Sequence, residues 1–168
     1  LLDYNRKLAD TPTELERVEI EEIVDIVVAS HSLPARAKMI HTDVTLAVGH
    51  CWAEPTLLMR VIDNLDSNAV HYGKESGNIW IYSRQIGNRV QIDVANNGTP
   101  IPDAERSMIF EPFYQGSHQR RGAVKGSGLG LSIARDCIRR MRGELSLITV
   151  DYADVCFRIE LPLLSDNE

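Results

Sequence analysis

The chain has 168 residues, of which 43% are hydrophobic and 25% charged, and its formal net charge is −6. This composition is typical of one compact globular domain and argues against a disordered chain. The acidic balance gives no support to nucleic-acid binding, which usually requires a basic surface. No apolar run approaches the roughly 18 residues that a membrane-spanning helix needs, and no stretch resembles a signal peptide. The chain begins with Leu1 rather than methionine, so we expect a piece of a longer protein.

The N-terminal half of the chain alternates between helix and strand patterns. Residues 1–8 are compatible with a helix, and residues 9–14 (ADTPTE) are typical of a linker. Helical spacing of apolar residues predicts an amphipathic helix from Val18 to about residue 39, with Pro34 in its late part. Residues 41–48 predict a strand. A second helix is expected from Glu54-Pro55 to Gly73, because Pro is favourable in a first turn.

The C-terminal half contains two hairpin patterns. Residues 78–85 and 89–96 predict strands joined by a Gly-Asn turn, and a short helix is expected around residues 104–109. Residues 115–125 form a polar, basic loop. Residues 128–142 predict a helix that Gly143 stops, and residues 144–150 and 154–163 predict a closing hairpin. This order predicts an α+β fold with helices on one face of a mixed or antiparallel sheet.

Three cysteines, Cys51, Cys137 and Cys156, lie far apart in the chain without a Cys-x-x-Cys pair. An odd, unclustered set favours reduced thiols in a cytoplasmic compartment over a disulfide framework or a zinc site. We therefore expect all three to pack in or near the core, and we propose no catalytic cysteine.

A row of polar side chains follows one side of the helix expected at residues 54–73. Asn64, Asn68, His71 and Tyr72 are spaced i, i+4, i+7 and i+8. Such a row is ordinarily a solvated face. An amide oxygen is also a suitable single protein ligand for Mg²⁺, which otherwise keeps water and phosphate oxygens. The row alone leaves both interpretations open.

Glycines at the start of the helix expected near residue 128 suggest an anion site. Backbone N–H groups beside Gly126, Gly128 and Gly130 can approach an anion closely, and the helix directs its positive end toward it. A simple flexible hinge explains the glycines equally well. Upstream cations fit either a solvated loop or a lid over a polyphosphate. They are Arg120, Arg121 and Lys125.

Four stretches in this order resemble the catalytic, ATP-binding domain of sensor histidine kinases, within the gyrase/Hsp90/MutL-like ATPase superfamily. NLDSNAVHYG (64–73) resembles the N box, and NNGTPIP (96–102) lies where the first glycine box belongs. FEPF (110–113) resembles the F box and GSGLGLSIA (126–134) the second glycine box. The match spans roughly residues 53–163. It implies a two-layer α/β sandwich of the Bergerat type, in which about three helices cover one face of a mixed sheet of about five strands.

The resemblance implies an ATP site that includes Mg²⁺. Asn68 would bind the Mg²⁺ that bridges the phosphates, with Asn64 beside it. Tyr72 would pack on the adenine and His71 would lie near the phosphates. Asn96 stands where the family usually has an aspartate that accepts a hydrogen bond from the adenine N6 amine. The other implied ATP-site residues are Gly98, Ile101, Phe113, Arg120, Arg121, Lys125, Gly126, Gly128, Leu129 and Gly130.

The first glycine box departs from the family pattern. The usual Asp-x-Gly-x-Gly becomes Asn96-Asn97-Gly98-Thr99-Pro100, without the aspartate and the second glycine. Because a neutral amide accepts a weaker hydrogen bond than a carboxylate, we expect ATP affinity to fall by about tenfold at most. An amide can also turn its NH₂ toward guanine O6, so discrimination against GTP is expected to be softer.

The chain also lacks a histidine in the sequence context of the family's phosphoacceptor. The histidines are His31, His41, His50, His71 and His118. The closest match, His31-Ser32-Leu33-Pro34, is poor. We therefore expect the chain to bind ATP without phosphorylating itself.

The implied function is the kinase half of a two-component sensor, which transfers the ATP γ-phosphoryl group to a histidine and thence to a response-regulator aspartate. The implied partners are the dimerisation domain of the same kinase and a cognate response regulator, not nucleic acid. Residues 1–13 would comprise the end of the dimerisation helix and a linker. Residues 14–168 would form the catalytic domain. We expect the chain to be a monomeric cytoplasmic domain of a membrane-anchored, homodimeric inner-membrane sensor.

Two other functions remain open from the residues. One is a non-enzymatic nucleotide-binding module whose first glycine box is degenerate. The other is an ATP-hydrolysing clamp of the gyrase/MutL kind. The clamp needs a base such as glutamate near Asn68. The position four residues before Asn68 is occupied by Asn64, which argues against that function.

Overall fold

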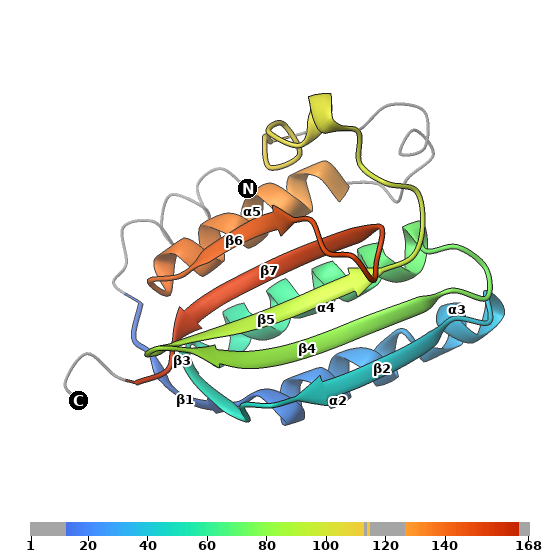
Figure 1. Ribbon diagram of the computed structural model, residues 1–168. Coiled ribbons are helices and arrows are strands. Elements are labelled where there is room, and N and C mark those ends of the chain that lie inside the picture. The colour runs from blue at the N-terminus through green and yellow to red at the C-terminus, as the bar shows by residue number, and fades with distance from the viewer. Residues whose placement is uncertain (1–12, 113, 115–126, 165–168) are drawn as a thin grey trace.

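The computed structural model describes residues 13–112, 114 and 127–164 (Figure 1). Five strands form a mixed sheet in the order β2-β4-β5-β7-β6, in which β2 and β4 are parallel and the other neighbours antiparallel. Three long helices cover one face of this sheet, which confirms the predicted α+β sandwich. The helices are α2 (Ile20–Ser30), α4 (Pro55–Tyr72) and α5 (Ser127–Arg140). The strands are β2 (His41–Leu46), β4 (Asn78–Ile86), β5 (Arg89–Asn96), β6 (Glu144–Ile148) and β7 (Val155–Pro162).

Strict alternation along the central strands separates the two faces of the sheet. Ile79 and Ile81 on β4, and Ile92 and Val94 on β5, face the helices and are at most 2% exposed. Each such side chain contributes roughly 1.5–3 kcal/mol on burial. The helix α4 begins as expected, since Pro55 lies in its first turn and Glu54 Oε2 accepts a hydrogen bond from the Leu57 amide at 2.7 Å.

The structure contains a second, two-stranded sheet that the sequence did not predict. β1 (Glu16–Glu19) pairs antiparallel with β3 (His50–Ala53). The helix expected from Val18 therefore starts at Ile20, because pairing with a distant strand overrides the local helical pattern.

The same expected helix also divides near its end. It breaks at His31, and α3 (Ser32–Ala37) follows. Pro34 has no N–H to donate to the Ser30 carbonyl, so the α2 hydrogen-bond ladder cannot continue through it.

Of the remaining expected elements, one lies within the described residues and two lie outside them. The short helix expected around residues 104–109 is wrong, because the described backbone there contains only a 3₁₀ turn, η1 (Asp103–Glu105). A segment of this length gains too few hydrogen bonds to nucleate an α-helix by itself. The expected helix at residues 1–8 and the loop at residues 115–125 lie outside the described residues.

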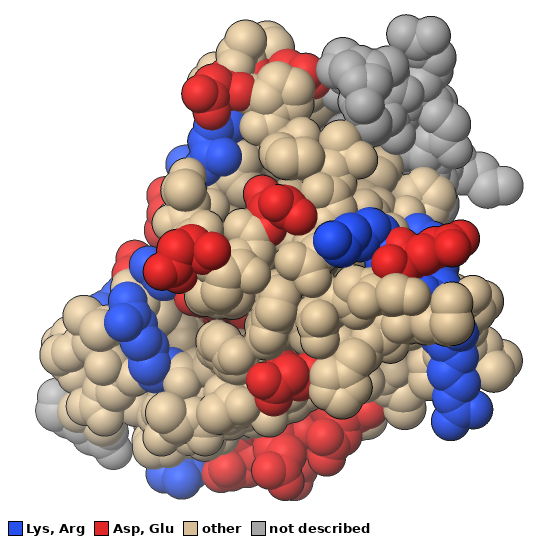
Figure 2. All heavy atoms as spheres, turned by 45° about the vertical axis from the view of Figure 1, so that its right-hand side comes forward, with Lys and Arg blue, Asp and Glu red and all other residues tan. Residues whose placement is uncertain are grey.

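All three cysteines are free and buried, as expected. Burial raises the pKa of the Cys51 and Cys156 thiols to about 12, so neither is a thiolate at neutral pH. No helix within the described ranges is long and apolar enough to cross a bilayer. Figure 2 shows acidic and basic side chains interspersed over one face of the molecule, with acidic ones gathered along its lower edge.

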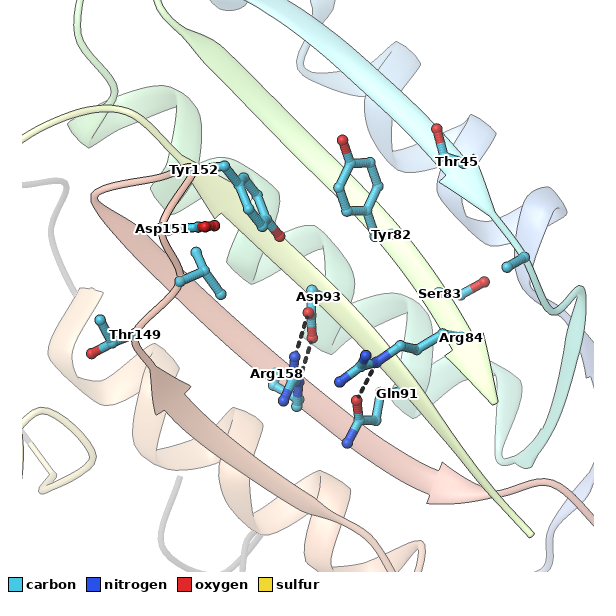
Figure 3. Close-up of a pocket in the computed structure, with 12 residues that line it drawn as sticks. Thr45, Tyr82, Ser83, Arg84, Gln91, Asp93, Thr149, Asp151, Tyr152 and Arg158 are labelled. Atoms are coloured by element: carbon cyan, nitrogen blue, oxygen red, sulfur yellow. Dashed lines mark hydrogen bonds and ion pairs between the residues drawn. The ribbon is translucent and has the colours of Figure 1, made fainter. Parts of the chain in front are cut away.

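The face of the sheet away from the helices carries paired polar side chains (Figure 3). Arg158 on β7 donates from Nε and Nη2 to the two carboxylate oxygens of Asp93 on β5, at 2.8 and 2.9 Å. Gln91 accepts from Arg84 Nε at 2.8 Å and donates to Glu160 at 2.7 Å. The hydrogen bond from Arg158 to Asp93 raises the pKa of the guanidinium above its usual value. The bidentate pair therefore links β5 and β7.

We expect Asp93→Ala to lower the free energy of unfolding by about 1–3 kcal/mol, because it leaves the half-buried Arg158 guanidinium without its carboxylate. Urea denaturation measures this change. Since the two side chains act as one unit, Asp93→Ala combined with Arg158→Ala should cost clearly less than the sum of the single variants. Gln85→Ala, at the exposed end of β4, is the control. Strictly additive losses would contradict the prediction.

Candidate functional site

The C-terminal half of α4 carries the polar row that the sequence predicts. Asn64 and Asn68 are half-buried and lie one helical turn apart. Tyr72 is also half-buried, and its ring meets that of His71 edge-on with 4.6 Å between centroids. His71 itself is exposed. The four residues thus belong to one continuous segment of a rigid helix.

The helix α5 approaches this row at a glycine. A Cβ atom placed on Gly130 would lie 2.9 Å from Asn64 Oδ1 and 3.0 Å from Asn64 Nδ2, so a larger residue would displace the asparagine. A groove of about 250 Å³ runs between α4 and α5, and Asp63, Asn64, Ser67 and Gly130 contribute to its walls. The N-terminal turn of α5, with its positive end, lies close to the asparagine row.

The turn after β5 reaches the same end of α4. Gly73 and Gly98 form an antiparallel bridge, and the Lys74 amide donates to the Asn97 carbonyl at 3.1 Å. A Cβ atom on Gly98 would lie 2.4 Å from the Tyr72 carbonyl oxygen. Only glycine permits so close an approach of the two backbones.

Asn96 is a buried polar residue at the end of β5. Its side chain is on the helix-covered face, since its register partners Ile79 and Val155 are buried, and only 4% of the residue is exposed. Its Nδ2 donates to the Asn97 carbonyl at 2.8 Å. Its Oδ1 accepts no hydrogen bond from any described residue. This oxygen is therefore an acceptor that a ligand could use.

Lys38 holds the C-terminus of α4, and the sequence analysis did not select it. Its Nζ donates to the carbonyls of Val70, His71 and Gly73 at 2.9, 2.6 and 3.1 Å. These carbonyls lie at the helix end, where no further turn supplies them with donors. No short-range pattern could reveal this cap, because Lys38 lies 32 residues from Val70 in the chain.

Asp154 holds the turn after β5 and was also missed. Its amide donates to the Asn96 carbonyl at 3.1 Å, and its Oδ2 accepts from the Gly98 amide at 3.0 Å. Gly98 and Asp154 are 56 residues apart, so only the β5–β7 pairing brings them together.

A buried carboxylate lies two residues before Asn68. Asp66 is 2% exposed, and its Oδ1 has no hydrogen-bond partner among the described residues. Burial raises the pKa of Asp66 to about 6, while nearby His31 lowers it and Asp63 raises it. His31, at the end of α2, is itself hydrogen-bonded to Asp63 at 2.7 Å. The residue pattern of the helix gave no signal for this carboxylate, because its burial depends on tertiary packing.

The remaining predicted site residues differ in how far the structure describes them. Ile101 is 6% exposed and belongs to the core, so its contact with a ligand stays a prediction. The F-box residue Phe110 packs edge-on against Phe157, and the Arg135 guanidinium lies 4.7 Å above its ring centroid. Gly128 and Leu129 are in the first turn of α5, where only the backbone is described. Outside the described residues lie Phe113, Arg120, Arg121, Lys125 and Gly126.

The side chains near α4 suit a metal ion whose other ligands come mainly from a bound nucleotide and water. Among the residues that the structure describes, no group of three or more His, Cys, Asp or Glu side chains could hold a metal. Asn68 contributes a neutral amide oxygen, which suits Mg²⁺ that keeps phosphate and water oxygens. The residues present therefore fit Mg²⁺ that enters together with a nucleotide.

A larger hollow of about 620 Å³ lies on the opposite face of the sheet (Figure 3). Tyr82, Arg84, Tyr152 and Arg158 contribute to its lining, and none of the predicted site residues does. Two of the charged residues that line it, Arg158 and Asp93, are paired with each other. The candidate site is therefore the region around the C-terminal half of α4.

Comparisons with known proteins agree with this geometry. The profile of the histidine kinase-, DNA gyrase B-, and HSP90-like ATPases matches residues 53–165. The chain is 70% identical over 162 residues to sensor histidine kinase GlrK of Escherichia coli (strain K12) and to sensor histidine kinase QseE of Escherichia coli O157:H7. Each alignment covers 96% of this chain and 34% of the relative, so the chain spans about a third of these proteins.

Solved structures point to the same domain. The nucleotide-free catalytic domain of histidine kinase ThkA superposes with a TM-score of 0.77 at 28% identity, covering 90% of this chain and 97% of that one. The matched profile includes α4, the turn after β5 and α5, which are the elements that converge at the candidate site. The chain therefore belongs to the histidine kinase-, DNA gyrase B- and HSP90-like ATPase family, as the ATP-binding catalytic domain of a sensor histidine kinase.

Proposed function

We propose that the chain holds ATP with Mg²⁺ and presents the γ-phosphoryl group to a histidine on the dimerisation domain of its own kinase. The observation that carries this proposal is the convergence of two separate stretches, the start of α5 and the turn after β5, on α4. Asn64 contacts Gly130 of α5, while Tyr72 and Gly73 contact Gly98 of the turn after β5. These contacts bring together the residues that the family resemblance assigns to metal, base and phosphates.

Each side chain has a positioning task in this proposal. The Asn68 amide oxygen binds Mg²⁺, Asn64 lies beside it, and Asn96 Oδ1 accepts from the adenine amine. Tyr72 packs on the base and His71 lies near the phosphates. When bound, Mg²⁺ neutralises charge on the phosphate oxygens. The backbone at the start of α5 and the preceding cations hold the phosphates: Arg120, Arg121, Lys125, Gly126, Gly128, Leu129 and Gly130.

Positioning and charge neutralisation account for catalysis, and the reaction needs little covalent chemistry from this domain. The attacking nucleophile is the histidine of the dimerisation domain, since no histidine of this chain has a phosphoacceptor context. The histidine then passes the phosphoryl group to an aspartate of a response regulator. Residues 1–13 would form the end of the dimerisation helix and the linker to the catalytic domain, residues 14–168, in a membrane-anchored homodimer at the inner membrane.

Transfer in trans tests this proposal. The chain is mixed with a purified dimerisation domain that contains the phosphoacceptor histidine, and γ-labelled ATP with Mg²⁺ is added. Label should appear on that domain, and not on this chain incubated alone. A dimerisation domain with its histidine replaced by alanine is the control. Nucleotide binding without transfer, under conditions that activate a related kinase, would instead indicate a regulatory nucleotide-binding module.

A further inference from the structure

The orientation of the Asn96 amide is determined by its neighbour. The Asn97 carbonyl lies 2.8 Å from Asn96 Nδ2. A backbone carbonyl can only accept a hydrogen bond, so the NH₂ group must face it. The reverse orientation would bring two acceptor oxygens together in a residue that is 4% exposed. One N–H of Nδ2 is therefore committed to Asn97, and Oδ1, on the opposite side of the amide, is the acceptor that the side chain can offer a ligand.

Asn97 is held in place from two directions. Its amide donates to the Asn78 carbonyl at 3.1 Å, and its Oδ1 accepts from the Asn78 amide at 2.9 Å. Its carbonyl also accepts from the Lys74 amide at 3.1 Å. The acceptor that orients Asn96 is thus tied both to β4 and to the segment that follows α4.

The loop between β6 and β7 clamps the other side of the turn. The Asp154 amide donates to the Asn96 carbonyl, and this bond survives any substitution of the side chain except proline. The Asp154 carboxylate accepts from the Gly98 amide at 3.0 Å. A hydrogen bond to a carboxylate is stronger than one between neutral groups. Gly98 meanwhile lies against the Tyr72 carbonyl, so a shift of Gly98 would disturb both sides of the base site.

We propose that Asp154 is a positioning residue for this turn, which presents a hydrogen-bond acceptor, Asn96 Oδ1, to the C6 substituent of a purine. The inference rests on the proposed ATP site. A 6-amino purine can donate to Oδ1, whereas a 6-oxo purine would set oxygen against oxygen. The site therefore selects adenine nucleotides over inosine and guanine nucleotides, although asparagine replaces the usual aspartate. The weaker discrimination against GTP that the sequence predicts would require an Asn96 amide that is free to turn.

Nucleotide selectivity in matched variants tests the proposal. ATP, ITP and GTP are titrated by calorimetry, with Mg²⁺, into the wild-type chain and into Asp154→Ala, Asp154→Asn and Asp151→Ala. The wild-type chain should bind ATP about tenfold or more tightly than ITP. In Asp154→Ala, ATP affinity should fall by about three- to tenfold. The ratio of ATP affinity to ITP affinity should also decrease. Asp154→Asn should restore both, because its amide oxygen can accept from Gly98.

Two controls separate positioning from a general loss of structure. Asp151→Ala removes an exposed carboxylate from the same loop and should match the wild type. Thermal unfolding establishes that each variant is folded. Hydrogen exchange of the Gly98 amide, followed by NMR without nucleotide, should accelerate in Asp154→Ala and remain unchanged in Asp151→Ala.

Different outcomes overturn different conclusions. An unchanged ATP/ITP ratio in Asp154→Ala, with wild-type ATP binding intact, would overturn the positioning role alone. Equal wild-type affinity for ATP and ITP would overturn the selectivity. A wild-type chain that binds no purine nucleotide would overturn the proposed function and this inference together.

Discussion

Replacing Asn68 by alanine should abolish the magnesium dependence of ATP binding and slow phosphoryl transfer to the dimerisation domain by at least about 100-fold. Asn68 is half-buried on α4, one turn beyond Asn64, which contacts α5. In the proposed site its amide oxygen is the protein ligand of Mg²⁺. Alanine keeps the helix but removes that oxygen, so the ion loses its attachment to the protein and the phosphates lose their alignment.

The measurement compares ATP affinity in the presence of Mg²⁺ with affinity in the presence of a chelator. For the wild-type chain the two values should differ, and for Asn68→Ala they should coincide near the chelator value. Asn88→Ala, the same change at the exposed β4–β5 turn, should behave as the wild type. If Asn68→Ala kept the full magnesium dependence and transfer rate, the assignment of the metal ligand would be wrong.

Replacing Asp66 by asparagine should stabilise the domain at neutral pH. Asp66 is 2% exposed, and burial raises its pKa from the ordinary 3.8 to about 6. Each pKa unit corresponds to about 1.4 kcal/mol, so the charged group costs the folded state about 3 kcal/mol near pH 7. Asparagine has nearly the same shape and no charge. The gain in the free energy of unfolding should therefore approach this amount.

The pH dependence of that gain distinguishes it from a simple packing effect. The folded state binds the Asp66 proton more tightly than the unfolded state, so protonation stabilises the wild-type fold as pH falls through about 6 toward 4. The advantage of Asp66→Asn should thus be largest above about pH 6.5 and vanish near pH 4.

Urea denaturation at a series of pH values follows this difference. Asp136→Asn, at an exposed position of α5, is the control and should change the free energy of unfolding little at any pH. A stability difference between wild type and Asp66→Asn that does not vary with pH would show that the Asp66 charge is not the cause.

Much of the fold follows from patterns within single elements. Period-two alternation identified β4 and β5, and Pro and Gly signals placed α4 between Glu54 and Gly73. Where a distant partner decides the conformation, the local pattern was insufficient. Val18 and Glu19 were expected to begin a helix, yet they belong to β1 because β3 offers its hydrogen-bonding edge. One continuous helix containing Pro34 was expected here, but the structure divides it into α2 and α3 at His31.

Local runs such as NLDSNAVHYG or NNGTPIP already identify which residue types could bind a nucleotide and in which order they occur. How these runs meet depends on tertiary packing. It brings Asn64 against Gly130 and caps α4 with Lys38. It also turns the Asn96 amide so that the oxygen remains available. Side-chain spacing is encoded along the chain, whereas hydrogen-bond partners far apart in sequence become neighbours only when the sheet and helices pack.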